Sequence, residues 1–407
     1  MSPATYRAGA FLAAAKRLKL DVVRGIDLPE PLAEFWDVRL GLDFTQPEAA
    51  AAKLVAYAAD YPVDAVLALD DSATLVAAIA SNELGLPQND PLSALAARDK
   101  FVMRERLAAA GVPVPSYRRY PLTSDPRAIA TETAFPCVVK PLRLSGSRGV
   151  IRADDPASLV AAWERTKQIL LNDGHDPATT DLLIERYLPG VEVAVEGLLT
   201  GGELRVLALF DKPDPLEGPF FEETIYVTPS RLPAATQNAI ARRTAEAAAA
   251  IGLREGPVHA ELRINDEDVW PIELAGRSIG GLCSSVLEFG TGISLEELIL
   301  RHAVGYPLPA VERDTRAAGV MMIPIPKGGI LRAVDGVEEA QRTPSVTGVE
   351  ITAKLNNPLV PLPEGASYLG FIFARAATAA SVEAAMREAH ARLTFTIEPT
   401  IMLISRP

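Results

Sequence analysis

The stretch "GPVHAELRINDEDVWPIELAGR", residues 256–277, has the pattern of two strands joined by a polar turn. Side chains alternate between the two faces of a strand. We take residues 257–264 and 269–277 as antiparallel strands, and a turn centred on Glu267 would place Glu261 and Glu273 directly opposite each other. Opposed side chains have Cβ atoms about 5 Å apart, so two like charges there are destabilising unless a cation lies between them.

Magnesium suits such a carboxylate pair, and Mn²⁺ is a second possibility. Mg²⁺ is a hard ion that takes one or two carboxylates and completes its octahedron with water and phosphate oxygens. Two alternatives stay open: a solvated polar face on which Arg263 and Arg277 damp the repulsion, and a different register of the strands. A phosphate-binding element elsewhere in the chain would favour the metal, because MgATP needs both.

A second stretch, "FPCVVKPLRLSGSRGV" at residues 135–150, is a candidate for that element. An apolar strand ends in Lys140, and residues 145–149 form a loop of serine, glycine and arginine. Small residues let backbone N–H groups approach a phosphate closely, and the lysine adds a point charge. The alternative is an ordinary surface hairpin loop. Together the two stretches predict a nucleotide site.

The composition predicts a globular protein of the cytoplasm. The 407 residues include 40 basic and 52 acidic ones, and the net charge of −12 makes nucleic acid or an anionic membrane a poor partner. Cys137 and Cys283 are too few for a disulfide framework, and we expect both to be buried small hydrophobes. No run of about 18 apolar residues predicts a membrane span, and the first residues lack a signal-peptide pattern.

The first hundred residues alternate helices with apolar strands, which is typical of a parallel α/β domain. The domain opens on a helix, so we expect either that its first strand is missing or that the true start lies upstream. Gly85 is a usual residue at a helix end and closes the last of these helices. The expected elements are a helix over 6–19, a strand over 20–26, a helix over 47–60, a buried strand over 63–71 and a helix over 72–85.

The rest of the chain predicts two more domains. Gly201-Gly202 between apolar runs signals a tight hairpin, and an alanine-rich helix is expected over 234–252. The last hundred residues are rich in proline and glycine and end in a strand–helix–strand pattern typical of an α+β domain. The predicted domains are residues 1–98, 99–306 and 307–407.

Taken in order, these pieces resemble the ATP-grasp superfamily over nearly the whole chain. Besides the two stretches above, they are Lys100 in "RDK", "IERYLPGVE" at 184–192 and Lys212 in "FDK". The resemblance implies an ATP-grasp fold of α/β and α+β type. It has an N-terminal parallel α/β (pre-ATP-grasp) domain, the ATP-grasp domain itself and a C-terminal α+β domain.

The resemblance also implies roles for individual residues. Lys212 would reach the γ-phosphate of ATP, and Arg277 would stabilise an acyl phosphate during catalysis. Glu261 and Glu273 would hold one or two Mg²⁺ ions. The residues implied in ATP binding are Lys100, Lys140, Ser145, Gly146, Ser147, Gly149, Glu185, Arg186, Leu188, Glu192 and Lys212. Of these, Arg186 and Leu188 would bind through their backbone.

Within the superfamily the chain is most similar to the L-amino acid ligase and carnosine synthase group. This rests on "LFDKPDPLEGPFFEETIYVTPSRLP" at 209–233, followed by a hairpin and a C-terminal domain rich in proline and glycine. Two positions depart from the family pattern. Ala275 stands where a family asparagine often completes a second metal site, and Tyr226 stands where relatives often have a histidine.

The substrate site is expected beside this segment. Solvated loops seldom carry three aromatic rings as close together as residues 218–229 do, which favours a cleft. We predict that Glu223 and Tyr226 line the site, with Glu223 binding a substrate ammonium group. The backbone N–H groups of Gly280 and Gly281 would complete its far side. The alternative is that the rings pack the loop onto the core.

The implied function is ATP-dependent ligation. A carboxylate, expected to be that of an amino acid, is activated as an acyl phosphate, and an amine then forms the amide with release of ADP and phosphate. The alternatives are a non-amino-acid amine or a thiol as acceptor, and an ATP-binding protein that ligates nothing. The expected partners are small molecules, and a homodimer is possible.

Overall fold

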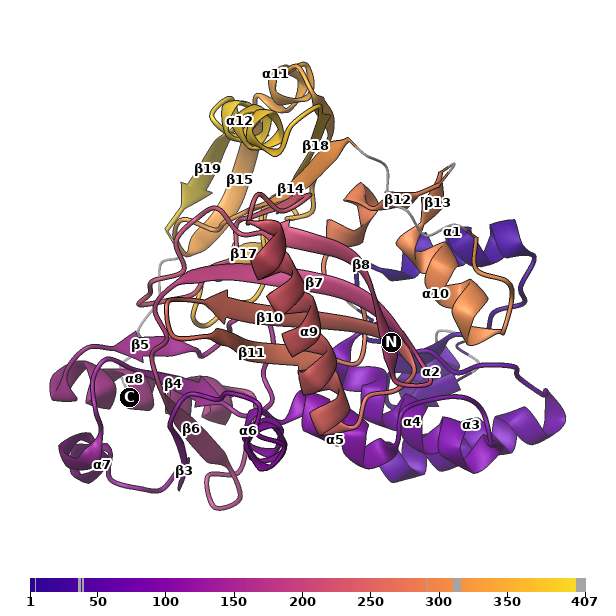
Figure 1. The fold of residues 1–407 in the computed structure, drawn as a ribbon, viewed down its shortest axis with the longest axis horizontal. Helices are drawn as coiled ribbons and strands as arrows, with labels where there is room; N and C mark the ends of the chain where they lie inside the picture. Colours follow the sequence, from indigo (N-terminus) through magenta and orange to yellow (C-terminus); the bar gives the residue numbers. More distant parts are fainter. Residues whose placement is uncertain (4, 36–37, 39, 291, 310–315, 400–407) are drawn as a thin grey trace. The chain divides into compact units, whose positions relative to one another are not determined.

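The computed structural model of the chain describes residues 1–3, 5–35, 38, 40–290, 292–309 and 316–399 (Figure 1). The chain forms two compact units. Unit 1 comprises Met1–Val114, Val193–Leu209 and Leu232–Thr315, and unit 2 comprises Pro115–Glu192, Phe210–Arg231 and Arg316–Pro407. Neither unit coincides with one of the three expected domains, whose boundaries stay a prediction.

Unit 1 contains the N-terminal helices and a run of strands in the order β11-β10-β7-β8. Its helices are α1 (Ala8–Leu18), α2 (Glu30–Phe35), α3 (Pro47–Asp60), α4 (Asp71–Leu84), α5 (Pro91–Arg98), α6 (Lys100–Ala109), α9 (Ala234–Ile251), the 3₁₀ helix η1 (Cys283–Val286) and α10 (Leu295–Ala303). Its strands are β1 (Gly25–Asp27), β2 (Leu40–Leu42), β7 (Val191–Thr200), β8 (Glu203–Asp211), β10 (Gly256–Ile264), β11 (Val269–Ala275), β12 (Glu288–Phe289) and β13 (Ile293–Ser294). Residues 191–192 of β7 and 210–211 of β8 belong to unit 2.

Helix α9 lies across strands β7, β10 and β11 of unit 1 (Figure 1). Its buried residues recur every three or four positions, which gives one apolar stripe along the helix. The stripe consists of Ile240, Thr244, Ala247, Ala248 and Ile251. The strands turn Val193, Val195, Val258, Ala260 and Leu262 toward the same core. The predicted helix over 234–252 is therefore confirmed, and it anchors the strand pair that carries Glu261 and Glu273.

The N-terminal part of unit 1 contains all three predicted helices with nearly the predicted bounds, the first of them as α1 (Ala8–Leu18). Helix α3 begins at Pro47 and ends at Asp60, and α4 ends at Leu84. Gly85 follows with φ +69°, the left-handed conformation that a glycine adopts at a helix end without a steric penalty. Strands β1 and β2 pair in parallel, as expected of an α/β domain.

The predicted buried strand over 63–71 is wrong. Residues 63–69 belong to no strand, all but the exposed Asp64 are partly buried, and Asp71 is already the first residue of α4. Within the described part of the chain, no backbone group of 63–69 bonds another backbone group. An apolar β-type sequence becomes a strand only where a neighbouring strand pairs with it. The predicted strand over 20–26 is likewise shorter, since β1 begins at Gly25.

Unit 2 contains three sets of strands, in the orders β3-β6-β4-β5, β9-β14-β18-β16 and β17-β15-β19. The strands are β3 (Tyr117–Pro121), β4 (Cys137–Pro141), β5 (Ile151–Ala153), β6 (Asp181–Arg186), β9 (Ile225–Thr228), β14 (Ala317–Ile323), β15 (Gly329–Asp335), β16 (Val346–Ile351), β17 (Pro358–Leu359), β18 (Gly370–Ala376) and β19 (Thr394–Glu398). The helices are α7 (Pro126–Glu132), α8 (Pro156–Asn172), α11 (Val337–Gln341) and α12 (Ala379–His390).

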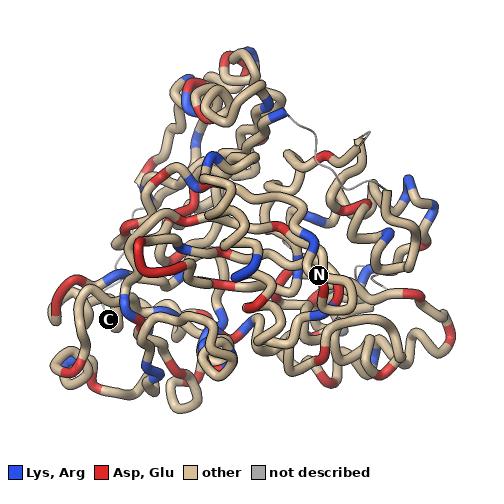
Figure 2. Tube along the Cα trace, in the orientation of Figure 1, with Lys and Arg blue, Asp and Glu red and all other residues tan. Residues whose placement is uncertain are grey.

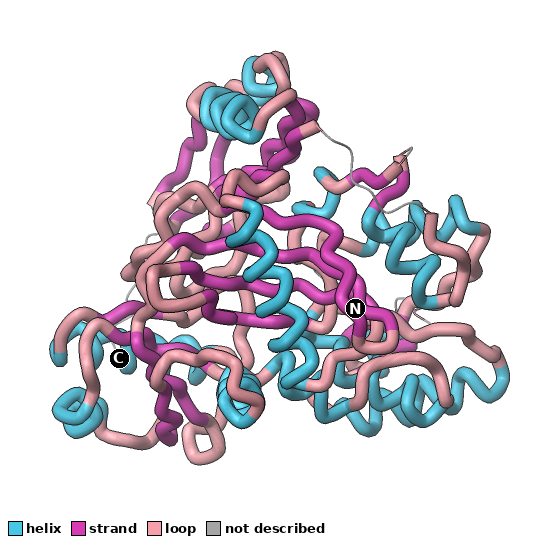
Figure 3. Tube along the Cα trace, viewed as in Figure 1, coloured by secondary structure: helices cyan, strands magenta, loops and turns pink. Residues whose placement is uncertain are grey.

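Two helices build the cores of unit 2. Helix α8 buries Leu159, Trp163 and Leu170 against β4, β5 and β6. Helix α12 packs on β14 and β18, and the predicted strand–helix–strand end of the chain is confirmed as β18, α12 and β19 (Figure 3). Acidic and basic residues are interspersed along the chain (Figure 2). Among the described helices, none is long and apolar enough to cross a bilayer.

Candidate active site

The predicted site residues fall into two groups. Those of the nucleotide-binding stretches and the 209–233 segment lie in unit 2, and Lys100, Arg277, the two glutamates of the hairpin and the two glycines after it lie in unit 1. The contacts and distances of each group are those within its own unit.

In unit 2, Lys140 and Glu185 form a buried ion pair. Strands β4 and β6 run antiparallel, with Lys140 opposite Leu183 and Val138 opposite Glu185. The Lys140 ammonium lies 2.5 Å from a Glu185 carboxylate oxygen, and the two side chains are only 9% and 2% exposed. Two buried opposite charges that stay paired need further polar partners to offset desolvation. Lys140 and Glu185, both predicted to bind ATP, are therefore joined as one buried ion pair.

The phosphate-loop candidate, residues 145–149, connects β4 to β5. Gly146, Ser147 and Gly149 all have positive φ, of 62°, 55° and 71°. Successive left-handed residues turn backbone N–H groups toward one side, a geometry that favours anions. A Cβ on Gly146 would lie 3.2 Å from the Cβ of Ala366, so the loop packs closely on the C-terminal part of unit 2.

This loop is also fastened by Arg148. Its guanidinium donates to both carboxylate oxygens of Asp173 at 2.6 and 2.8 Å and to the Glu364 carbonyl oxygen at 2.6 Å. The Gly149 N–H donates to the carbonyl oxygen of Pro363 at 2.9 Å. Side-chain and backbone hydrogen bonds therefore both hold the loop, and its role in phosphate binding stays a prediction.

The "IERYLPGVE" stretch leaves β6 at Arg186. The Arg186 N–H donates to the Ser116 carbonyl oxygen at 2.8 Å, so that donor already has a partner within unit 2. Tyr187 and Leu188 are buried, and Tyr187 forms an apolar cluster with Val138 and Val150. Such a cluster beside a buried lysine–glutamate pair offers the apolar surface that a nucleotide base requires.

Three predicted residues surround Lys212. Its ammonium donates to Glu192 at 2.8 Å and also to the Glu223 carboxylate, and it lies 5.0 Å from the centre of the Tyr226 ring. Tyr226 is 2% exposed and packs on Phe210. Its ring is therefore a buried wall behind the lysine, while Glu223 is the more open of the two carboxylates, at 18% against 9%.

The other aromatic rings of this segment favour the packing alternative. Phe220 packs against the core under α8, and Phe221 packs with Val138, Val150 and Tyr187. The expectation of a ring-lined cleft therefore has no support from these two side chains.

In unit 1, the predicted opposition of Glu261 and Glu273 is present. The turn comprises residues 265–268, and a bulge after Glu261 restores the register that places the two glutamates opposite each other. Their side chains are 21% and 30% exposed. Lys100 lies 3.6 Å from Glu273, and the His259 ring lies 3.5 Å from Glu261.

This pair fits a hard divalent cation. Both carboxylates are partly exposed, project from directly opposed positions and supply only oxygen ligands, which Mg²⁺ and Mn²⁺ prefer. Ala275 is 3% exposed and offers no side-chain oxygen, as the sequence predicts. The residues present therefore suit one ion better than two.

His259 is a packed histidine whose pKa is raised. Its Nδ1 atom lies 2.6 Å from the Glu196 carboxylate, and the ring is almost fully buried. Burial by itself would lower the pKa of His259, but the hydrogen bonds to Glu196 and Glu261 outweigh it and raise the pKa to about 9. The sequence analysis left Glu196 unassigned, although it is the second of two acids in the apolar run "VEVAVEGLL", a signal that could have found it.

Arg277 is held by a residue that the sequence did not assign. Its Nε and one terminal nitrogen donate to the two oxygens of Asp71 at 2.9 and 2.6 Å. Burial lowers the pKa of Arg277, but the charge of Asp71 outweighs it, and the net pKa is raised. For Asp71, burial raises the pKa and the charge of Arg277 outweighs it, so the net pKa is lowered. The two groups thus stabilise each other's charged forms.

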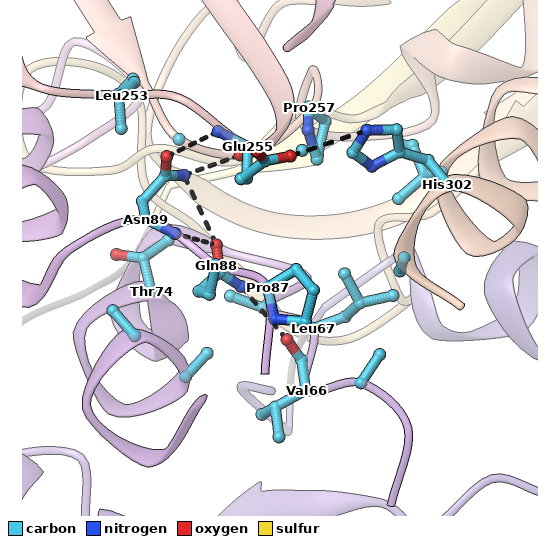
Figure 4. A pocket seen from close by; sticks show the side chains of 18 of the residues that line it. Val66, Leu67, Thr74, Pro87, Gln88, Asn89, Leu253, Glu255, Pro257 and His302 are labelled. Carbon is cyan, nitrogen blue, oxygen red and sulfur yellow. Dashed lines mark hydrogen bonds and ion pairs between the residues drawn. The ribbon is translucent and has the colours of Figure 1, made fainter. Parts of the chain in front are cut away.

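A separate cavity of about 460 Å³ lies in unit 1 (Figure 4). Val66 and Leu67 line it on one side, and Asn89, Glu255 and His302 line it on others. The Asn89 side chain already bonds the backbone of residues 254 and 255. None of the predicted site residues lines this cavity.

Comparison with known protein families agrees with this arrangement. Residues 12–88 match the ATP-grasp N-terminal domain, residues 133–286 the ATP-grasp domain and residues 321–398 the L-amino acid ligase C-terminal domain 2. An L-amino acid ligase from Bacillus licheniformis superimposes with a TM-score of 0.79 at 27% identity, covering 96% of this chain and 95% of that one.

The chain therefore has the ATP-grasp fold. It belongs to the ATP-grasp superfamily and carries the C-terminal domain of the L-amino acid ligases.

Two curated relatives match part of their length. The uncharacterized protein y4rH of Sinorhizobium fredii is 26% identical over 77% of this chain, and alanine–anticapsin ligase of Bacillus subtilis is 25% identical over 67%. The chain covers 64% and 60% of these two relatives. The activity of the whole protein is therefore a matter for proposal.

Proposed function

We propose that this chain is an ATP-dependent carboxylate–amine ligase that joins two amino acids through an acyl phosphate. The main support for the proposal is the directly opposed pair Glu261 and Glu273, because two carboxylates facing each other across adjacent strands repel each other unless a cation lies between them. The names of the relatives, an L-amino acid ligase and an alanine–anticapsin ligase, support amino acids as the substrate class.

The proposed reaction has two steps. In the first, a substrate carboxylate oxygen attacks the γ-phosphorus of ATP, the bond to the β-phosphate oxygen breaks, and ADP leaves. In the second, the amine nitrogen of the other substrate attacks the acyl carbon and loses a proton to solvent. The carbon–oxygen bond then breaks, and phosphate leaves with its electron pair.

The residues of the chain would bind and neutralise charge in these steps. Lys140 and Lys212 are the cations for the phosphates, and Arg277 is the cation for the acyl phosphate. Glu223, the more exposed partner of Lys212, would bind the ammonium group of a substrate. A Mg²⁺ ion at Glu261 and Glu273, when bound, would supply charge neutralisation at the phosphate oxygens.

A screen of amino-acid pairs tests the proposal. We expect phosphate and ADP to form in equal amounts only when a productive pair, ATP and Mg²⁺ are all present, and a dipeptide mass to appear with them. Tight ATP binding without phosphate release from any pair would favour the second candidate, an ATP-binding protein that ligates nothing. Phosphate release with a simple amine or a thiol, and with no amino-acid pair, would instead identify another acceptor.

A further inference from the structure

Three consecutive residues of unit 1, Arg277 to Ile279, each form hydrogen bonds to a different side chain. Asp71 holds Arg277, as described above. Arg7, the residue before α1, donates to the Ser278 carbonyl oxygen at 2.9 Å and to its hydroxyl at 2.7 Å.

Glu196 of strand β7 binds the third of these residues, Ile279. One of its oxygens, Oε1, accepts the Ile279 N–H at 2.8 Å and also contacts Nδ1 of His259 at 2.6 Å. The backbone is therefore held at Ser278 and Ile279, directly after a residue whose side chain is held by Asp71.

The next two residues are glycines whose N–H groups stay available. Within the described part of the chain, no hydrogen bond from the N–H of Gly280 or Gly281 is found. A Cβ at Gly280 would meet nothing within 4 Å, and Gly281 has φ +60°. Two adjacent open N–H groups directly after three anchors form a preorganised donor pair for a negatively charged oxygen.

Glu196 stands in a position where a carboxylate is costly. Its side chain is 0% exposed, and its second oxygen, Oε2, is buried without a hydrogen-bond partner in the described structure. A buried charge carries a large desolvation penalty, and an unsatisfied buried oxygen in a folded protein calls for a functional explanation. Arg7 shows the same feature, since its Nε is buried and unpartnered although its terminal nitrogens are engaged.

We propose that Glu196, supported by Arg7, is a positioning residue of the ligation reaction. Its carboxylate holds the Ile279 N–H so that the N–H groups of Gly280 and Gly281 keep one orientation toward the oxygen that becomes negative when the acyl phosphate forms and breaks. Neither side chain needs to touch the substrate. This inference rests on the proposed function for its chemistry and on the contacts of unit 1 for its geometry.

The first test is amide hydrogen exchange of the peptide that contains residues 278–282, and it needs no activity. Glu196→Ala should speed exchange in this peptide by about tenfold or more, because the acceptor of the Ile279 N–H is lost and the segment opens locally. Glu196→Gln keeps an amide oxygen for that N–H and should stay near the wild type. Glu297→Gln is the matched control, since Glu297 is also buried and ion-paired but contacts Arg17 and Arg301 instead.

The second test is steady-state kinetics with the best amino-acid pair. Glu196→Ala should lower kcat by roughly 100-fold with the ATP KM nearly unchanged, because a small misplacement of donors acts on the transition state. Arg7→Met should act in the same direction, and Glu196→Gln should recover most of the loss. A wild-type protein without ligation would contradict the proposed function, and the exchange experiment would still decide separately whether Glu196 holds residues 278–282.

Unchanged exchange in Glu196→Ala would overturn the inference. Faster exchange together with full kcat would also overturn the inference, because the hydrogen bond from the Ile279 N–H to Glu196 would then have no effect on the reaction.

Discussion

Asp71 and Arg277 lie 206 residues apart in sequence and form a bidentate ion pair inside unit 1. The two parallel N–H···O bonds fix the plane of the guanidinium as well as its position, which a single lysine ammonium could not achieve. Arg277 is the residue assigned to the acyl phosphate, so its orientation bears directly on the proposed chemistry.

We expect Asp71→Asn to lower kcat by about 100-fold, because the amide cannot accept both N–H bonds and the guanidinium loses its fixed plane. The ATP KM should change less than kcat, since the hydrogen-bond partner of the Asp71 carboxylate is Arg277, the residue assigned to the acyl phosphate. Steady-state kinetics measures both quantities. Asp64→Asn, at an exposed position just upstream, should behave like the wild type. Full activity of Asp71→Asn would contradict a catalytic role for the orientation of Arg277.

The metal site makes a second prediction. Glu273→Gln should abolish turnover while leaving the thermal midpoint within a few degrees, because it removes one charge at constant shape from a side chain that is 30% exposed. Turnover at saturating ATP and Mg²⁺ is the measurement. Glu267→Gln, in the exposed turn of the same hairpin, is the control that should remain active. An active Glu273→Gln enzyme would rule out the carboxylate pair as the metal site.

The hairpin could be predicted because its pattern is local in the sequence. Pairs between distant residues could not be predicted in this way. Glu261 and Glu273 are 12 residues apart on strands with a period of two, so alternation places both on one face, and a turn centred on Glu267 would oppose them. The turn at residues 265–268 is not centred there, and the bulge after Glu261, which restores the opposition, does not follow from alternation. The Asp71–Arg277 pair depends on how distant segments pack, which one sequence does not encode locally. The failure at residues 63–69 has the same origin, because an apolar run predicts burial but not a partner strand.

The phosphate loop makes a third prediction, with Arg148 as its reporter. Trypsin cleaves after arginine only when the side chain and backbone are free, and here both Asp173 and Glu364 hold Arg148. We expect Asp173→Asn to speed cleavage at Arg148 without nucleotide, and MgATP to slow it in both proteins as the loop closes on phosphates. Asp154→Asn removes a nearby acid that pairs with Arg152 and should change nothing. Equal cleavage with and without MgATP would argue for a purely structural loop.

The thiol of Cys137 gives a prediction on pH. Burial raises its pKa from an ordinary 9.0 to about 12, with a smaller contribution from Asp154. At pH 8 roughly one thiol in ten thousand is then ionised, so iodoacetamide should label the folded protein very slowly and the unfolded protein quickly. Above pH 9 the unfolded thiol ionises and the folded one does not, so the free energy of unfolding should fall from pH 9 to about 12. Cys137→Ala should lose that part of the pH dependence, and rapid labelling of the native thiol would contradict the prediction.

The last prediction concerns the substrate. Glu192 and Glu223 both bond Lys212, but Glu192 is the more buried and Glu223 retains more exposure. Removal of Glu223 should therefore leave Lys212 paired with Glu192 and ATP binding largely intact. A substrate ammonium, in contrast, would lose its counter-ion.

We expect Glu223→Ala to raise the KM of one amino-acid substrate by roughly tenfold or more, since a hydrogen bond to a charged group contributes about 1.5–3 kcal/mol. The ATP KM should change by less than about threefold on the same scale. Initial rates with each substrate varied in turn separate the two effects, and Glu222→Ala, the neighbouring acid, is the control. If neither KM changes, the ammonium binds elsewhere. If the ATP KM alone rises, Glu223 serves Lys212 and the nucleotide, and the substrate pocket must be sought among the residues of unit 1 around Gly280 and Gly281.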